Sequence, residues 1–227
     1  MCGRYSLFTP PAELEDRFDV TFDVDWEPRY NLAPSQSLPV VTNHDPERVS
    51  LQTWGLVPEW ADDGFSGLIN ARAETADEKP AFREAYQRRR CLVFADGFYE
   101  WVETEEGKQP HRVALEDDEP FAMAGLWERR VPEQQQTGLG DFGGSGPTGG
   151  PEPEETFTIL TTEPNDLVGE LHHRMAVILP KGREREWLER PDEELLTPYP
   201  SDRMRAYPVS TRVNSPANDD ASLIEPV

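Results

Sequence analysis

Short apolar or alternating runs recur along the chain, and turn-forming Gly, Pro, Asn and Asp residues separate them. Alternation with a period of two indicates β-strands that bury one face, and a short fully apolar run indicates a strand buried on both faces. We expect strands at residues 38–42, 49–56, 91–95, 111–115, 121–127, 156–162 and 176–179. The first two would form a hairpin around Asp45-Pro46, and Asp96-Gly97 is a strong signal for a tight turn.

Helical signals are few and short. Thr9 is a candidate N-cap, and Pro10-Pro11 would open a helix that ends at Phe18. Further helices are expected at residues 80–90, 165–171 and 181–190, of which the first is basic and amphipathic. Short helices beside many strands indicate a β-rich α+β fold.

The length of 227 residues suits one domain that carries an insertion. Residues from about 132 to 155 are Gln, Gly, Pro and Glu with almost no hydrophobic side chains, so we expect a flexible insertion within a loop. Residues 217–227 are expected to be a frayed C-terminal tail, which leaves 1–216 as the domain. No apolar run is long enough to span a membrane, and no signal peptide is apparent, so we expect a cytoplasmic protein.

The formal net charge is −22, which at face value argues against nucleic-acid binding. The acidic residues are spread along the whole chain, and lysine occurs only at positions 79, 108 and 181. This composition favours adaptation to molar salt over an acidic binding function. Several arginines nevertheless stand in motif-like stretches, among them Arg4, Arg72, Arg174 and Arg212. The alternative for such residues is ordinary surface pairing with the abundant carboxylates.

The chain begins Met1-Cys2-Gly3-Arg4-Tyr5. If Met1 is removed, Cys2 carries a thiol and an α-amine on adjacent carbons, and this 1,2-aminothiol can condense with an aldehyde to give a thiazolidine. Both groups are partly reactive near neutral pH, because their usual pKa values are about 8.5 and about 7.7–8.0. The alternative is a disordered N-terminus that happens to contain a cysteine. The chain has no clustered Cys/His spacing, so no metal site is expected.

Three further stretches carry polar residues in unusual settings. Glu100 lies between Tyr99 and Trp101 in an expected strand, and a buried carboxyl group there would have a raised pKa. Asn70 opens an alternating polar and alanine segment, which suggests a strand end or loop lining a site. His172-His173 precedes a strand, and such a pair is a metal-site fragment, a structural pair or a general acid/base.

Two tryptophans, Trp54 and Trp60, flank Pro58. They are either core residues, which the pair alone favours, or a stacking platform for unpaired bases.

Seven ordered blocks together resemble the SRAP (SOS response-associated peptidase) family, and the match runs from Met1 to about Pro216. The blocks are Met1–Tyr5, Tyr30-Asn-Leu-Ala-Pro34, Trp54–Pro58, Asn70-Ala-Arg-Ala-Glu-Thr75, Arg90–Trp101, Leu171-His-His-Arg-Met175 and Val209-Ser-Thr-Arg-Val-Asn214. This chain departs from the family's usual pattern at His173, where an acidic residue is usual, and at Phe94, where Pro is usual.

The resemblance implies a single domain with a curved, mostly antiparallel, barrel-like sheet, flanked by short helices and bearing a positively charged groove. It implies that processed Cys2 captures abasic sites in single-stranded DNA as a thiazolidine crosslink, without cofactor or metal and as a monomer. Asn70 and Glu100 would line the pocket, and His172 would assist proton transfer and crosslink reversal. The DNA-binding candidates are Arg4, Pro34, Trp54, Trp60, Arg72, Arg174 and Arg212.

Two other functions remain open. One is a cysteine peptidase that uses Cys2 and His172 on other proteins, and the other is a non-covalent reader of damaged bases that stacks them on Trp54 or Trp60. Adjacent side chains of an extended segment point to opposite faces, so only one of His172 and His173 should face the Cys2 pocket, and we expect His172. We also expect arginines to gather in one groove inside an acidic shell.

Overall fold

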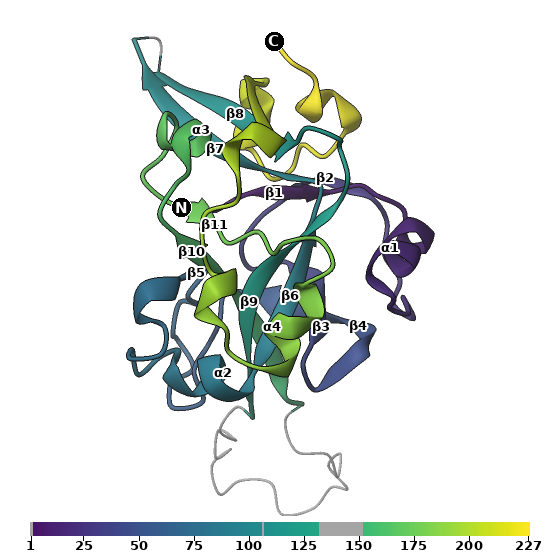
Figure 1. Ribbon diagram of the computed structural model, residues 1–227, viewed down its shortest axis with the longest axis vertical. Coiled ribbons are helices and arrows are strands. Elements are labelled where there is room, and N and C mark those ends of the chain that lie inside the picture. Colours follow the sequence, from purple (N-terminus) through teal and green to yellow (C-terminus); the bar gives the residue numbers. More distant parts are fainter. Residues whose placement is uncertain (1, 106, 132–151) are drawn as a thin grey trace, which may run out of the picture.

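Twelve strands and several short helices make up the part of the chain described by the computed structural model, which is residues 2–105, 107–131 and 152–227 (Figure 1). The strands are β1 (Tyr5–Leu7), β2 (Arg29–Leu32), β3 (Ser37–Thr42), β4 (Asp45–Trp54), β5 (Asn70–Arg72), β6 (Arg90–Ala95), β7 (Gly97–Thr104), β8 (Gly107–Leu115), β9 (Phe121–Arg130), β10 (Glu154–Thr162), β11 (Met175–Ala176) and β12 (Met204–Pro208). The α-helices are α1 (Pro11–Phe18), α2 (Arg83–Arg88), α3 (Asp166–Gly169) and α4 (Glu184–Glu189). The β-rich α+β fold is therefore confirmed.

Five strands close into a barrel. The pairing runs β10-β4-β3-β6-β9 and returns to β10, and only the β10–β4 contact within this ring is parallel. Closure leaves no exposed edge among these strands, and their inward side chains fill the interior. Val40, Val93, Phe157 and Ile159 are fully buried there. The barrel is the rigid body on which the rest of the molecule is built.

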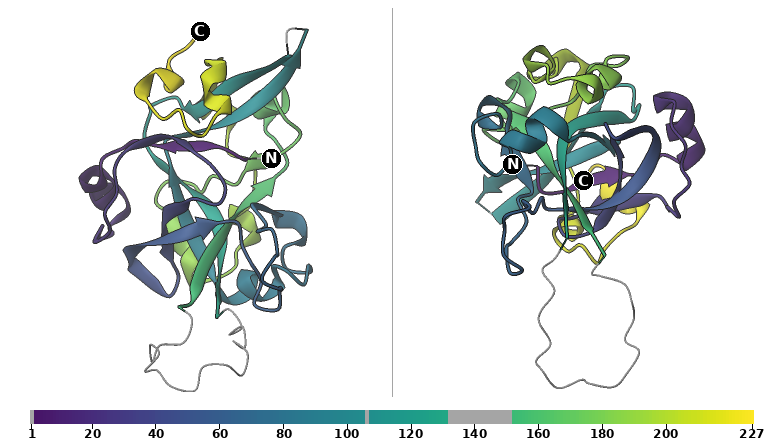
Figure 2. Two further views of the ribbon diagram at one scale, coloured as in Figure 1. Left: turned by 180° about the vertical axis from the view of Figure 1, so that it is seen from behind. Right: turned by 90° about the horizontal axis from the view of Figure 1, so that it is seen from below.

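A second, antiparallel sheet has the order β12-β8-β7-β1-β2 and covers one end of the barrel (Figure 2). The chain passes from β6 in the barrel to β7 in this sheet at Asp96-Gly97. The tight-turn expectation at this pair is therefore corrected, because the two flanking strands belong to different sheets. The Asp96 carboxylate accepts hydrogen bonds from the backbone of Phe8 and Thr9 and from Thr9 Oγ1, and these bonds fix the corner.

The corner also explains two local features. Thr9 is not the N-cap of α1, because its hydroxyl binds Asp96 and Pro10 occupies the cap position. Gly97 is required because a Cβ atom there would lie 2.8 Å from the Val113 carbonyl oxygen.

Strand β10 brings distant segments together. Besides its barrel neighbours, it pairs in parallel with β5, where Ile159 lies opposite Asn70, and antiparallel with β11, where Thr161 lies opposite Ala176. The start of the chain lies beside β11 in Figure 1. Segments around residues 2, 70 and 175 therefore meet on one side of the molecule.

The C-terminal segment corrects an expectation. Residues 217–227 are not frayed, because Leu223 is fully buried and Asp219 accepts a hydrogen bond from the Tyr30 amide. The predicted insertion falls mostly on residues 132–151, which lie outside the described residues, while Glu154 and Glu155 belong to β10. Among the described residues, no helix is long and apolar enough to cross a membrane.

Candidate functional site

Cys2 is fully buried at the entrance to β1. The Asn70 side chain donates a hydrogen bond of 2.8 Å from Nδ2 to the Cys2 carbonyl oxygen, and the Cys2 thiol lies 4.0 Å from the Arg4 carbonyl oxygen. This anchoring rules out a disordered segment from residue 2 onward. With Met1 present, the Cys2 nitrogen is part of a peptide bond, so the amine chemistry described above requires removal of Met1.

Glu100 reaches the same region because of strand alternation in β7. Tyr99 and Trp101 pack on one face in a small core with Val209 and Leu223, so Glu100 between them points to the opposite face. Glu100 is 2% exposed, and burial raises the pKa of its carboxyl group to about 7. A group that is half protonated near neutral pH can act both as an acid and as a base.

The Cys2 thiol is affected by the same environment. Burial, and next the charge of Glu100, raise the pKa of Cys2 to about 12. The thiol is therefore neutral at physiological pH, and it has to lose its proton as it reacts.

Asn70, at the start of β5, contributes a second polar atom. Its Oδ1 is buried and has no hydrogen-bond partner within the described residues. A buried amide oxygen of this kind usually has a ligand or water partner. Asn70 can therefore hold Cys2 with one end of its amide and orient a substrate group with the other.

His172 lies between a turn at Leu171 and a bend at His173, not in a strand. Its Nδ1 lies 3.0 Å from the Arg174 amide nitrogen and 3.2 Å from the Arg174 carbonyl oxygen, and the ring tautomer decides which of the two it bonds. Burial lowers the pKa of His172, and the positive charge at the amino end of the chain acts in the same direction. A neutral imidazole is thus favoured near pH 7.

The expectation that the side chains of His172 and His173 point to opposite faces is wrong. The rings of His172 and His173 stack with centroids 4.2 Å apart, so they lie on the same side of the backbone. The bend removes the alternation that an extended segment would impose. His172 is half-buried and His173 is exposed, so burial distinguishes the two residues where direction does not.

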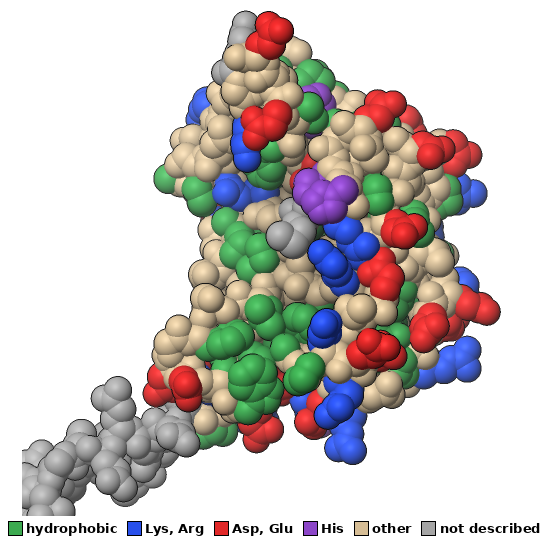
Figure 3. Space-filling view, turned by 90° about the vertical axis from the view of Figure 1, so that its left-hand side faces the viewer, with side chains coloured by type: hydrophobic (Ala, Val, Ile, Leu, Met, Phe, Trp, Pro, Cys, Tyr) green, Lys and Arg blue, Asp and Glu red, His purple; other side chains and the backbone are tan. Residues whose placement is uncertain are grey.

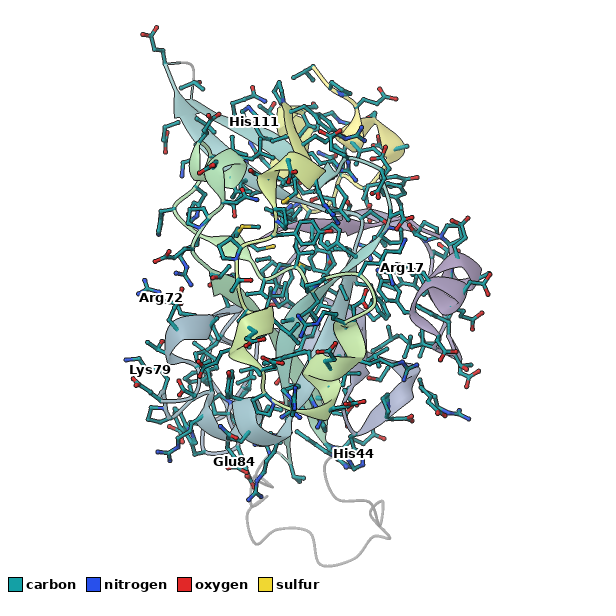
Figure 4. All side chains as sticks on the ribbon, viewed as in Figure 1. Arg17, His44, Arg72, Lys79, Glu84 and His111 are labelled. Carbon is teal, nitrogen blue, oxygen red and sulfur yellow. The ribbon has the colours of Figure 1, made fainter. Side chains whose placement is uncertain are left out.

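The candidate arginines differ in how many ion pairs and hydrogen bonds their side chains make within the protein. Arg174 makes a two-pronged ion pair with Glu74, at 2.8 and 2.7 Å, and also binds the Thr161 carbonyl oxygen. Arg212 pairs with Asp220 at 2.7 Å. Arg72 is exposed and has no side-chain partner among the described residues, and it points out from the left-hand side in Figure 4.

Arg4 is different again, because both of its acceptors are neutral. Its Nη1 donates to Asn31 Oδ1 and to the Val213 carbonyl oxygen, each at 2.8 Å. Burial lowers the pKa of Arg4.

The two tryptophans fall into different classes. Trp54 is fully buried, packs against Tyr5 and Phe157, and donates from Nε1 to the Ile69 carbonyl oxygen at 2.9 Å. Its assignment to DNA binding is therefore corrected, and it is a core residue. Trp60 is 63% exposed and meets Phe65 edge-on. Pro34 lies half-buried in the turn between β2 and β3.

Figure 3 shows the face on which the chain begins. Histidine side chains lie near its centre, Lys and Arg side chains lie directly below them, and hydrophobic side chains gather lower down. Acidic side chains lie to the right of the basic ones and along the edges of this view. The surface around the site is therefore not uniformly acidic, despite the net charge of −22. The described residues contain no group of three or more His, Cys, Asp and Glu that could hold a metal ion.

The closed barrel carries a site that combines a buried cysteine next to the start of the chain with an amide and a carboxyl group from distant strands. The chain belongs to the SOS response associated peptidase (SRAP) family, whose model matches residues 1–216.

Individual relatives are similar to this chain over nearly its whole length. The chain is 40% identical to the abasic site processing protein YoaM of Bacillus subtilis, covering 99% of this chain and 98% of the relative. It is 29% identical to the abasic site processing protein YedK of Escherichia coli, with complete coverage of both. A crystal structure of a Bacteroides thetaiotaomicron protein superposes with a TM-score of 0.82 at 26% identity, again with complete coverage of both chains.

Sequence reasoning overlooked Asn31 and the small core around Tyr99. Asn31 is fully buried although it is polar, and its side chain touches residues more than 180 positions away. The only sequence signal was its place in the Tyr30–Pro34 block, which says nothing about its partners.

Proposed function

We propose that this protein processes abasic sites in single-stranded DNA by forming a covalent crosslink through Cys2 once Met1 has been removed. The observation that carries the proposal is the burial of Cys2 beside Glu100, a carboxyl group with a pKa of about 7, with Asn70 holding the Cys2 backbone. The names of the relatives in Bacillus subtilis and Escherichia coli support the choice of substrate.

The reaction uses both functional groups of the processed cysteine. The α-amine adds to the aldehyde of the ring-opened deoxyribose and gives a carbinolamine. Loss of one water molecule gives an imine. The Cys2 sulfur then adds to the imine carbon while the thiol proton passes to the imine nitrogen, which closes a thiazolidine. Ring closure removes the imine and so prevents β-elimination and strand cleavage.

The surrounding residues have roles that match these steps. Glu100 supplies a proton to the departing oxygen of the carbinolamine and, as a base, accepts one when the crosslink reverses. His172, neutral at pH 7, assists this transfer. Asn70 orients the amine or a sugar hydroxyl through Oδ1 without itself titrating.

Contacts to DNA would come from three of the candidate residues. Arg4 and Arg72 would bind phosphates, and Trp60 would use its exposed ring for stacking. Arg174 and Arg212 join them only by exchanging their present carboxylate partners. The protein would act as a monomer in the cytoplasm, where its DNA substrate lies.

The other two functions fit the geometry less well. A peptidase acting on other proteins needs an activated thiolate, whereas burial raises the pKa of Cys2 to about 12. Removal of the chain's own Met1 is the one peptide cleavage that we retain, and it would be hydrolase chemistry. A reader that stacks bases on Trp54 is excluded by the full burial of that ring.

Three proteins incubated with single-stranded DNA that carries one abasic site test the proposal on a denaturing gel with mass spectrometry. Wild type should give a crosslink that is stable without reductant, with intact DNA and a mass that lacks Met1. Processed Cys2→Ala should give only an imine that borohydride traps, with nicking by β-elimination. A protein with an extra residue ahead of Cys2 should give no crosslink, and a stable crosslink from it would refute the mechanism.

A further inference from the structure

The guanidinium of Arg4 is divided between the interior and the surface. Both hydrogens of Nη1 are directed at internal oxygens, those of Asn31 Oδ1 and the Val213 carbonyl, each 2.8 Å away. Neither hydrogen of Nη2 has an acceptor in the part of the chain that the structure describes. Arg4 also has no carboxylate partner there, although the chain has 44 acidic residues and most of its other arginines are ion-paired. A half-buried cation held only by neutral acceptors is suited to an anion from outside.

Asn31 is the residue that fixes this arrangement. Its side chain is fully buried, and its Oδ1 accepts from Arg4. Its Nδ2 donates to the carbonyl oxygens of Val213 at 3.3 Å, Ser215 at 3.0 Å and Asn218 at 2.7 Å. An amide nitrogen has only two hydrogens, so these three acceptors share them and the amide cannot flip without losing all of them.

The C-terminal segment holds Asn31 in turn. Asp219 accepts from the Tyr30 amide at 2.6 Å and from Arg29, so residues 213–219 are bonded along β2. Val213 and Leu223 are buried against Tyr99 in the small core. Part of the segment 213–219 that holds Asn31 lies beyond residue 216, where the family match ends.

We infer that Asn31, locked by residues 213–219, is a positioning residue that presents Nη2 of Arg4 to one phosphate of the DNA strand. The inference rests on the proposed function, which makes Arg4 a phosphate ligand. Holding the guanidinium in place before DNA arrives removes the entropy cost of ordering a long side chain on binding. The planar fork of arginine is necessary, because one end bonds inward while the other bonds outward.

Binding to an undamaged single-stranded oligonucleotide, measured over a series of salt concentrations, tests the inference without any crosslinking. Arg4→Gln should make the slope of log affinity against log salt shallower by about 0.7, the value for one phosphate on a single strand. Asn31→Ala should make the slope shallower by a similar amount. In the Arg4→Gln/Asn31→Ala double variant the slope should change no more than in either single variant. Arg4→Lys keeps the charge but lacks the fork, so it should behave like Arg4→Gln.

Asn43→Ala is the matched control. Asn43 also bridges the backbone and a side chain, through Oδ1 to the Arg90 amide and the Trp127 indole, but it lies in the β3–β4 turn. The Asn43→Ala substitution should lower the melting temperature and leave the slope of log affinity against log salt unchanged.

The outcomes separate the inference from the function on which it rests. If Arg4→Gln changes the slope but Asn31→Ala does not, Asn31 is only structural. If Arg4→Lys keeps the wild-type slope, a point charge suffices and positioning is refuted, and this result holds even when Asn31→Ala does not fold. If Arg4→Gln leaves the slope unchanged, Arg4 binds no phosphate, and the crosslinking gel decides independently whether Cys2 acts as proposed.

Discussion

The two cysteines of this protein are equally buried and differ in almost everything else. Cys2 and Cys91 are both fully inaccessible, and burial raises the pKa of both thiols. Cys91 lies in β6 of the barrel and packs closely against Gly125. A Cβ atom added to Gly125 would lie only 2.7 Å from the Cys91 sulfur. Only burial shifts the pKa of Cys91, whereas the pKa of Cys2 also responds to Glu100 and to the start of the chain.

The difference shows that burial of a thiol marks no function by itself. In the barrel, the sulfur fills space among apolar side chains. At the start of β1, the same group adjoins a carboxyl group, a bridging amide and, after processing, its own amine. In the proposed function, the chemistry at Cys2 depends on those neighbours, and each of them can be removed separately by substitution.

Glu100→Gln should have the largest effect, because it makes the surroundings of Cys2 resemble those of Cys91. Crosslink formation and reversal should slow by about 10²–10³-fold, as expected when a general acid/base is lost. Affinity for undamaged DNA should stay nearly the same. Rapid-quench crosslinking kinetics measure the rate, and an unchanged rate would remove Glu100 from the mechanism.

His172→Ala should slow crosslink reversal by about 10²-fold, at the lower end of the range for general acid/base catalysis. His173→Ala, its stacked neighbour, is the matched control and should reverse at the wild-type rate. Release of intact protein from purified crosslink measures both. A defect confined to His173→Ala would exchange the two assignments.

Stability against pH sharpens the comparison in a different way. Because the folded pKa of Glu100 is about 7, above its usual 4.5, the folded state keeps a proton that the unfolded state has lost, and stability falls as pH rises from about 4.5 to 7. Glu100→Gln should therefore be more stable than wild type by about 3 kcal/mol above pH 7, and equally stable below pH 4. Denaturant unfolding at a series of pH values measures this difference. Equal stability at pH 8 would mean that the carboxyl group is not desolvated.

Cys91→Ala should have the smallest effect, a loss of about 1–2 kcal/mol of folding stability from the cavity left in the barrel. Crosslinking should proceed at the wild-type rate. Thermal unfolding and the crosslinking gel measure the two quantities. A slower crosslink in this variant, at a temperature where it is fully folded, would show that the two thiols communicate.

Local patterns predicted the strands and the setting of Glu100, because strand alternation and aromatic neighbours determine which side chains are buried. They failed where the partner is remote in sequence, since the segment after Ala217 is ordered because Asp219 meets β2. For Trp54 the local pattern alone favoured the core, which its contacts with Tyr5 and Phe157 confirm, and the assignment to DNA binding was wrong. Nothing near these residues in the sequence indicates those contacts.

The same limit applies to the site. Cys2, Glu100, Asn70 and His172 were predicted from the family resemblance and from unusual polar settings, but their joint placement depends on pairing across the whole chain. The stacking of the two histidines follows from one bend, which their sequence neighbours did not reveal.

The spread of the site along the chain has a consequence for protein synthesis. Cys2 is made first, and His172 follows 170 residues later, which at about 5–20 residues per second takes about 10–30 s. The strands that surround Cys2 pair over long sequence distances, which slows folding further. During that interval Met1 caps the amine while the pocket does not yet exist. If Met1 is removed as proposed, the timing of that step decides whether the aminothiol of Cys2 meets cellular aldehydes before its pocket has formed or only inside the finished pocket.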